Sequence, residues 1–441
     1  NTLNKSYFDL HLLDNIEYIL LYMFFNALIT YVLMRKHIYS IFDPLFFGMI
    51  LAVCGYSTVF YLYHFDLIND YYFYSFIFTQ FFFFIGFLLN KPISMMDYSQ
   101  YNLVLSKNNK ITPAFFIYII SSVLFIFSQL FVYYASGIPV LMESRLAMYS
   151  GGSGYGIFSR IIYVTSIISL SFSVFRLLLM RNRLSSNLYD YFIIFFSLIV
   201  AALSGSKAGI LLLISTVFIT LFFGRKISFN EKIEKKFQKN SLSLLILLIP
   251  ISFLTIYAQL GFESVNEILI SLALRFIHSG DIFFMSYPND VLMHLNTNDN
   301  GFLAFFRGVF GALRLSSWEN LPVNLGLQVF WYHYDTDLIS GPNARHNVFG
   351  LFYFGFIGSL FFSFILGYVF GFVRNRLYKK LKPTQTNVIL YTLLVMSINY
   401  IGQDPSGQAL DYLFSVFLVF TPLYFISTIL YNLSKKSKTV K

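Results

Sequence analysis

Cysteine is almost absent from this chain of 441 residues, in which Cys54 is the only one. A single cysteine can form neither an intramolecular disulfide nor a cysteine-based metal site, so both are excluded as the basis of the fold. Charged residues are also scarce, at 12% of the chain, whereas soluble domains carry about 25%. The low charge content excludes an ordinary water-soluble globular protein.

Several other sequence features are missing. There is no internal repeat, no linker rich in proline or glycine, and no basic segment at the start that would indicate a cleavable signal peptide. No phosphate-binding loop, dinucleotide fingerprint or zinc motif occurs. We therefore expect one membrane domain, residues 1–441, that uses no metal or nucleotide cofactor.

Long apolar runs fill the chain instead. Hydrophobic residues make up 57% of it, aromatic residues 20%, and the mean hydropathy is +0.65. Runs of about 17–25 apolar residues can cross roughly 30 Å of hydrocarbon as helices, so we predict an all-α polytopic membrane protein with about eleven transmembrane helices. Residues 189–223 are read either as two short spans with a break at Ser204-Gly205-Ser206 or as one long kinked span. The predicted spans are 15–34, 42–63, 73–89, 113–135, 157–179, 189–203, 208–223, 242–260, 347–373, 387–402 and 410–432.

The positions of the basic residues predict the orientation. With the N-terminus outside and the C-terminus inside, most lysines and arginines fall in the inner segments, as the positive-inside rule requires. The net charge of +10 is then explained by contact with anionic membrane lipid, and no nucleic-acid partner is expected. The basic residues left for the outer side are Lys5, Arg145, Arg160, Lys207, Arg275, Arg307, Arg314 and Arg345.

Two outer loops are predicted, over residues 136–156 and 261–346. The larger loop contains amphipathic pieces at 263–278 and 302–315, which suit the membrane interface. A loop of this length in a compact protein usually serves function. Six of the eight outer basic residues are arginines, which bind phosphate oxygens with two hydrogen bonds at once.

The triplet Arg345-His346-Asn347 stands where the large loop meets the next apolar run. His346 can exchange a proton near neutral pH, with Asn347 orienting it, although it could also be an interfacial histidine that reaches water. A helix N-terminus favours anions, so the cation of Arg345 needs an anionic partner there. The triplet therefore suggests a site for a lipid-linked phosphate.

A second polar cluster contains Arg275, His278 and Asp281 in the segment LRFIHSGD. Spacing of three places these side chains on neighbouring helical positions. Asp281 could orient His278 or act as a base, and a local salt bridge with a helix cap is the alternative. The cluster adds a second candidate group for proton transfer.

Three further cations are candidates for phosphate binding. Lys207 lies between two apolar runs and needs a polar cavity, unless its side chain simply reaches the membrane surface. Arg314 shares a helix face with Arg307, and both could instead form the polar face of an interfacial helix. Arg145 lies in the smaller outer loop, before a glycine-rich run. None of these positions is decisive alone.

Short motifs in this chain match those of a known family. Arg145 is followed by ten residues and then Gly156, which matches an Arg-x10-Gly pattern, and LSGSKAG is similar to an SGSRxG element with Lys207 in place of the arginine. His346-Asn347 followed by Gly355 and Gly358 is similar to a His-Asn…Gly-x-x-Gly segment. With the overall layout, these motifs resemble the Wzy-type oligosaccharide repeat-unit polymerases, which are related to the WaaL-type O-antigen ligases.

The resemblance implies a GT-C-like glycosyltransferase in a Gram-negative inner membrane, with its active site facing the periplasm. Donor and acceptor would be glycans on undecaprenyl pyrophosphate, and a Wzz-type chain-length regulator could be a partner. His346, or alternatively Asp281, would be the catalytic base, with His278 and Asn347 orienting. The pyrophosphate-binding residues would be Arg145, Arg275, Arg345, Arg314 and Lys207.

Two other functions remain open from the sequence. A ligase would use the same donor and pass the glycan to lipid A-core. A flippase or other transporter should carry charged groups near the middle of the membrane and an internal repeat. The sequence predicts that the charges lie at the outer rim, which favours surface chemistry.

Overall fold

The computed structural model describes residues 5–94, 112–139, 156–179, 187–204, 207–227, 235–240, 242–243, 246, 274, 276–295, 299–334 and 341–439. These residues form helices and connecting turns, and no strand occurs among them. The helices of the first half are α1 (Lys5–Asp14), α2 (Ile16–Met34), α3 (Pro44–His64), α4 (Asp70–Leu88), α6 (Pro113–Ser136), α8 (Gly156–Leu179), α9 (Leu188–Leu203) and α10 (Lys207–Gly224). Those of the second half are η3 (His278–Gly280), α13 (Asp281–Ser286), η4 (Pro288–Asp290), α14 (Val291–His294), α15 (Gly301–Ala312), η5 (Trp318–Asn320), α16 (Leu325–His333), α17 (His346–Gly371), η6 (Phe372–Arg376), α18 (Leu377–Lys380), α19 (Gln385–Ile398), α20 (Pro405–Tyr412), η7 (Leu413–Phe420) and α21 (Thr421–Thr439).

In the described residues the predicted all-helical fold with apolar, span-length helices is confirmed, whereas the number of about eleven spans stays a prediction. Within the described ranges, seven helical stretches are long and apolar enough to cross a membrane: Ile16–Met34, Pro44–His64, Asp70–Leu88, Pro113–Ser136, Gly156–Leu178, His346–Lys380 and Pro405–Lys436. The helices α9, α10 and α19 are shorter apolar helices. The predicted break at Ser204 separates α9 from α10, so this region forms two helices, while most of the predicted span 242–260 lies outside the described residues.

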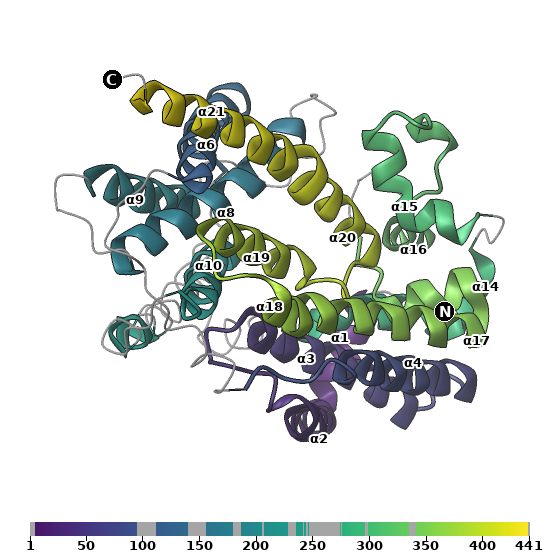
Figure 1. Ribbon diagram of the computed structural model, residues 1–441. Helices are drawn as coiled ribbons and strands as arrows, with labels where there is room; N and C mark the ends of the chain where they lie inside the picture. Colours follow the sequence, from purple (N-terminus) through teal and green to yellow (C-terminus); the bar gives the residue numbers. More distant parts are fainter. Residues whose placement is uncertain are drawn as a thin grey trace.

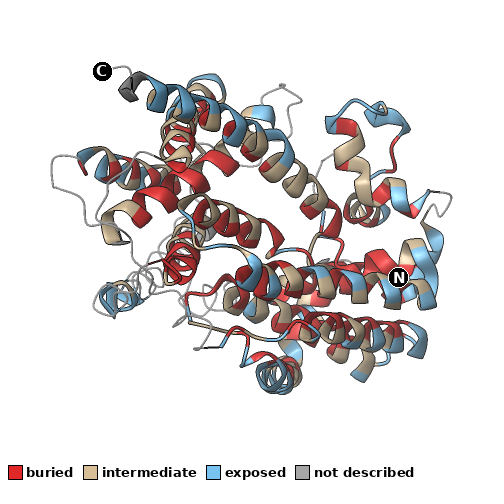
Figure 2. Cartoon of the chain, in the orientation of Figure 1, coloured by how far each residue is buried: buried red, intermediate tan, exposed pale blue. Residues whose placement is uncertain are grey.

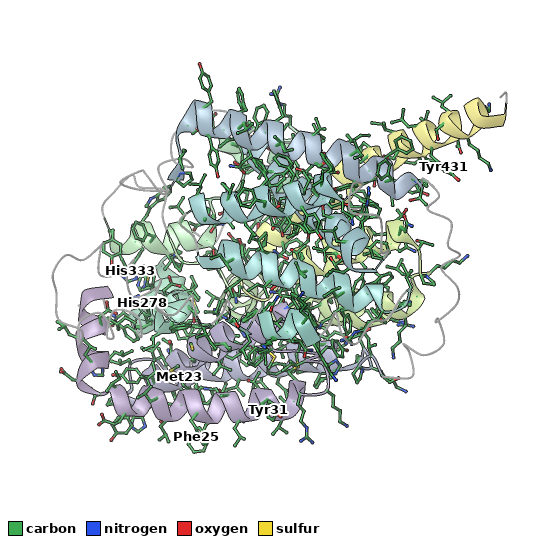
Figure 3. The ribbon with its side chains drawn as sticks, turned by 90° about the vertical axis from the view of Figure 1, so that its left-hand side faces the viewer. Met23, Phe25, Tyr31, His278, His333 and Tyr431 are labelled. Carbon is green, nitrogen blue, oxygen red and sulfur yellow. The ribbon has the colours of Figure 1, made fainter. Side chains whose placement is uncertain are left out.

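Figure 1 shows two groups of helices. In one group α2, α3, α4 and α17 lie side by side, and in the other α6, α8, α9, α10, α19 and α21 surround a core of aliphatic and aromatic side chains. Figure 2 shows that the buried faces point inward and that the outer faces are exposed. On α2, Phe25 and Tyr31 are about half exposed, at 49% and 57%, and point away from the bundle in Figure 3. Such an apolar outer surface suits contact with lipid.

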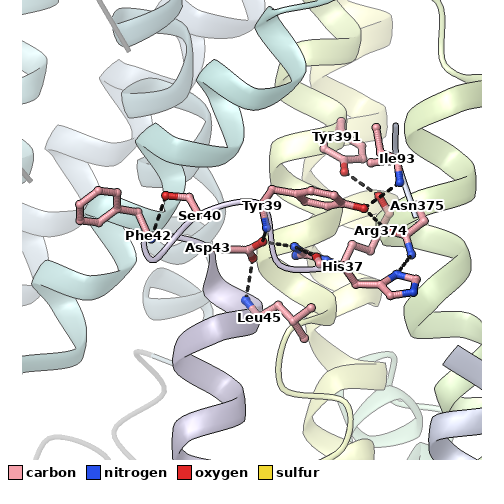
Figure 4. A network of polar contacts seen from close by, with 10 residues as sticks. All are labelled: His37, Tyr39, Ser40, Phe42, Asp43, Leu45, Ile93, Arg374, Asn375 and Tyr391. Carbon is pink, nitrogen blue, oxygen red and sulfur yellow. Dashed lines mark hydrogen bonds and ion pairs between the residues drawn. The ribbon is translucent and has the colours of Figure 1, made fainter. Parts of the chain in front are cut away.

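A buried polar network lies at the end of α17, where η6 meets the turn between α2 and α3 (Figure 4). Asp43, which caps α3 by accepting from the backbone N–H of Leu45 at 2.9 Å, forms an ion pair with Arg374. Both side chains are almost completely enclosed. Asn375 donates to Nδ1 of His37 at 2.8 Å. The network fixes the end of α17 against the turn between α2 and α3.

The helix α17 consists of two antiparallel arms rather than the single span predicted over 347–373. Gly355 has φ 66° and ψ −175°, which is not helical and is accessible in practice only to glycine. Nδ1 of His346 lies 2.9 Å from Oγ of Ser363, although the two would be about 25 Å apart along one straight helix. Residues 346–354 therefore run toward Gly355, and residues 356–371 run back beside them.

Candidate functional site

The triplet 345–347 lies deep in the bundle. The side-chain amide of Asn347 donates to Oγ1 of Thr79 at 2.9 Å, and Thr79 is in the middle of α4, about 13 Å from the first residue of that helix. Phe356, next to the apex of the hairpin, instead contacts Tyr71 at the beginning of α4. The prediction that these charges lie at the outer rim is wrong for Arg345, because the first arm of the hairpin begins inside the bundle.

Arg345 is buried, and its direct contacts include a backbone carbonyl and two aromatic rings. Its side chain is 4% exposed, and Nε and Nη2 both donate to the carbonyl oxygen of Ser279, at 3.1 and 2.6 Å. The guanidinium also lies over the rings of Tyr56 and Phe283, at 5.7 and 5.9 Å from the ring centres. Asp281 acts on it electrostatically. Burying a cation among a carbonyl and two aromatic rings is costly, so an anionic ligand would stabilise this arrangement.

Glycine makes room for the guanidinium. A Cβ added at Gly55 would lie 2.8 Å from Nη2 of Arg345, closer than such atoms approach each other. A Cβ at Gly280 would meet the carbonyl oxygen of Gly55 at 2.7 Å. The turn that carries Ser279 can therefore pack directly against α3 and present its carbonyl to the arginine.

His346 is held at three points. Its ring stacks on Phe83 with centres 4.6 Å apart, Nδ1 is hydrogen-bonded to Ser363, and its backbone N–H donates to the carbonyl oxygen of Gly402 at 3.2 Å. Nε2 is enclosed and makes no hydrogen bond with any residue that the structure describes. An imidazole with one nitrogen fixed and the other unused has the arrangement required of a general base.

A narrow cavity of about 50 Å³ runs beside this cluster. One end is polar, with Arg345, Asn399 and Gln403, and Gly402 places the wall next to the edge of the His346 ring. In this conformation the cavity could hold only about one or two water molecules. The remaining wall is mostly apolar and comprises Thr30, Met34, Leu45, Gly48, Met49, Ala52, Tyr56, Phe83, Phe84 and Phe370.

The side chains of the second predicted cluster do not pair as their spacing in the sequence predicts. Nε2 of His278 lies 2.7 Å from Oδ1 of Asp9 in α1, so a carboxylate from the start of the chain holds this histidine. Asp281 begins α13, and its Oδ1 accepts from the backbone N–H of Ile282 at 2.9 Å. Figure 3 shows His278 and His333 toward the same end of the molecule, near α1. The role of Asp281 as an alternative base remains a prediction.

Among the other predicted phosphate ligands, Arg314 is the one whose side chain the structure describes, and it lies away from this cluster. Arg314 follows α15 and lines a separate groove, together with Arg160. Arg145 and Arg275 lie outside the described residues, and for Lys207 the structure describes only the backbone, at the start of α10. Their roles in phosphate binding stay predictions.

Sequence reasoning missed the segment 399–404 between α19 and α20. Asn399, Gly402 and Gln403 line the cavity beside Arg345, although the sequence placed most of this segment inside an apolar span. Asp404 accepts from the backbone N–H of Gly407 at 3.0 Å, and Pro405 is the first residue of α20. An aspartate followed by proline is a typical helix start, so this signal could have predicted the break.

No family model, curated protein or solved structure matches this chain. The function must therefore be argued from the residues and their geometry. The features that carry most information are the buried cation, the unused imidazole nitrogen and the apolar cavity beside them.

Proposed function

We propose that this protein is a membrane glycosyltransferase that polymerises oligosaccharide repeat units carried on undecaprenyl pyrophosphate. It transfers the growing glycan to the non-reducing end of an incoming lipid-linked unit. The resemblance of the motifs at 145–156, 203–209 and 345–358 to Wzy-type polymerases supports this proposal. A GT-C-like architecture, a Gram-negative inner membrane, a periplasmic active site and a Wzz-type chain-length partner belong to the same proposal.

The single observation that carries the proposal is the environment of Arg345. The guanidinium is buried, its hydrogen bonds go to a neutral carbonyl, and it borders a mostly apolar cavity between helices. A lipid-linked pyrophosphate combines an anionic group with an apolar tail, which matches both parts of the site. Because the cavity is narrow, we expect α2 and α3 to separate when the tail enters.

The proposed reaction exchanges one bond at the anomeric carbon of the donor. The acceptor hydroxyl forms a new C–O bond there, and the C–O bond to undecaprenyl pyrophosphate breaks. His346 takes the hydroxyl proton on Nε2, while Ser363 holds Nδ1. Arg345 stabilises the negative charge that develops on the leaving pyrophosphate. No metal ion takes part in this scheme.

A transporter is the second candidate, and one observation favours it. The helix α17 is interrupted at Gly355, and Arg345 lies level with the middle of α4. Interrupted helices and buried charges near the middle of the membrane are typical of transporter binding sites. The motif resemblance and the unused nitrogen of His346 favour the enzyme.

The test is a surface-polysaccharide gel from cells that lack the gene. For a polymerase, these cells carry lipid A-core with one repeat unit and no ladder. Loss of the single capped unit as well would contradict the proposal. Lipid-linked glycan accumulating on the periplasmic side would then indicate a ligase, and accumulation on the cytoplasmic side would indicate a transporter.

Complementation with variants tests the site. Arg345→Lys and His346→Ala should fail to restore the ladder, because the first loses the guanidinium fork and the second loses the base. Arg376→Gln is the matched control, since Arg376 is exposed at the end of η6 and, among the described residues, donates to Tyr368 Oη at 3.1 Å. A full ladder from Arg345→Lys and His346→Ala at normal protein levels would refute the site.

A further inference from the structure

A second, larger cavity lies away from the Arg345 site. It is an open groove of about 870 Å³, formed by the first turn of α8, the end of α15, residues 316–319, and residues Leu410 and Phe414. This volume is within the range of small-molecule sites. The helices α15 and α20 pack against each other beside it, where the hydroxyl of Ser406 donates to the carbonyl oxygen of Ala304 at 3.2 Å. Packed helices therefore support one side of the groove.

Trp318 forms a flat surface in this groove. A Cβ added at Gly311 would lie 2.5 Å from the indole ring, so only glycine lets the ring rest against α15. The guanidinium of Arg307 lies 5.9 Å from the centre of the Trp318 ring, and Nε of Arg307 is enclosed by protein. Trp318 nevertheless remains 55% exposed. One part of the indole is thus packed against the protein, while the rest is open to the groove.

Charged side chains also line the groove, and one of them is held by an ion pair. Arg160 from α8 forms an ion pair with Asp411 from α20, with side-chain exposures of 35% and 19%. Gln408 also donates to the Asp411 carboxylate, at 3.3 Å. Arg314 and Glu319 add one charge of each sign on the exposed rim. Donors and acceptors are therefore offered together, with little net charge.

We infer that this groove, which we call the Trp318 groove, binds the oligosaccharide portion of a glycan substrate. Sugar rings present C–H groups on their faces, which stack on indole, and hydroxyls on their edges, which pair with carboxylates and guanidinium groups. The groove offers both kinds of contact, because its wall combines the indole and other apolar side chains with the charged groups of Arg160, Arg314 and Glu319. The inference rests on the proposed function only for the identity of the glycan. Sugar binding by the groove can be measured without measuring polymerisation.

Binding is measured by the fluorescence of Trp318 in the full-length protein in detergent. The chain has two tryptophans, so Trp331→Phe leaves Trp318 as the single reporter. The probe is the water-soluble oligosaccharide released by mild acid from the lipids of cells lacking the gene, and inorganic pyrophosphate is the comparison. We expect a saturable change with the oligosaccharide only. No change, or an equal change with pyrophosphate, would overturn the inference.

Variants test whether the indole and the ion pair carry the affinity. A radiolabelled form of the same oligosaccharide should bind about tenfold more weakly to Trp318→Ala, as expected for loss of an aromatic contact. Arg160→Gln should also weaken binding, whereas Trp331→Ala should bind like wild type. If the Trp318→Ala variant elutes as folded protein and binds the oligosaccharide as tightly as wild type, the proposed glycan site in the Trp318 groove is refuted.

The two proposals can fail independently. If the oligosaccharide binds at Trp318 but cells lacking the gene keep their polysaccharide ladder, the groove stands and the polymerase proposal falls. If His346→Ala abolishes the ladder but Trp318 gives no signal and Trp318→Ala keeps a normal ladder, the polymerase stands and the groove is refuted.

Discussion

The buried ion pair between Asp43 and Arg374 offers a direct test of the packing that supports the site. We consider Asp43→Asn, which keeps the side-chain volume and one oxygen that can accept from the backbone N–H of Leu45. The variant removes the negative charge, while Arg374 stays 1% exposed with the carbonyl oxygen of His37 as an acceptor at 3.2 Å. The helix cap is retained, so the measured effect reports the uncompensated charge together with the lost acceptor for the backbone N–H of Tyr39, which donates to Oδ2 of Asp43 at 3.1 Å.

The expected magnitude follows from the burial of both partners. Removing one member of a buried ion pair costs about 3–5 kcal/mol, because the remaining charge has lost its partner in a poorly solvated place. Since carbonyl and aromatic groups still surround Arg374, we expect the lower end, about 3 kcal/mol. Replacing both partners, as in Asp43→Asn with Arg374→Met, should cost less than Asp43→Asn alone, because no charge is left buried.

The assay is reversible unfolding of the purified protein in mixed micelles, followed by circular dichroism. The single variant, the Arg374→Met variant and the double variant complete a double-mutant cycle with wild type. A loss below about 0.5 kcal/mol for Asp43→Asn would refute the reasoning, since that is typical of an exposed pair. Strictly additive losses would also contradict it.

Three further predictions concern the hairpin, the histidine site and pH. Gly355→Ala should lower the free energy of unfolding by about 1–3 kcal/mol. The cause is the positive φ of residue 355 alone, because an added Cβ would meet open space. Gly156→Ala, where the Cβ also meets open space but φ is not positive, should lower the free energy of unfolding much less. Ser363→Ala should slow polymer formation in membrane vesicles about tenfold, because it removes the hydroxyl that holds the imidazole of His346. Ser359→Ala is the control, since the hydroxyl of Ser359 donates to the carbonyl oxygen of Phe356 in the same helix, and this variant should not slow the reaction. Equal rates of polymer formation for the two variants would contradict this prediction. Burial, and secondarily a neighbouring arginine, lowers the pKa of His37 to about 4. Unfolded chains therefore take up a proton on His37 that folded chains do not, and stability should fall by about 2 kcal/mol between pH 7 and pH 4. His37→Gln should lose this part of the pH dependence, and an unchanged slope would refute it.

Apolar runs predicted most of the long helices. Local capping signals could have refined their boundaries, because Asp43 before Pro44 marks the start of α3 and Asn69 marks the start of α4. These signals depend only on residues that are close in sequence: a side chain that caps the first turn of the helix, and a proline that lacks a backbone N–H. They can therefore be recognised in the sequence alone. The apolar runs themselves are long enough to be recognised without knowledge of their neighbours.

The hairpin in α17 could not be predicted in the same way. Residues 347–373 form one apolar run, and hydropathy does not distinguish a straight helix from two arms that fold back at Gly355. Contacts between distant residues were also hidden. His278 meets Asp9, 269 positions earlier, and Arg160 meets Asp411, 251 positions later, so spacing along the chain could select neither partner.

The short first arm of the hairpin has a consequence for biosynthesis. Residues 346–354 span about 12 Å as a helix, less than half the thickness of the hydrocarbon region, so this arm cannot insert as a span. Its contact partner Thr79 is synthesised 268 residues earlier, and Ser363 follows only after the turn. The arm must therefore dock onto helices that are already in place. A copy of the protein with every span inserted would still lack the contacts of Arg345, His346 and Asn347 until that late docking step had occurred.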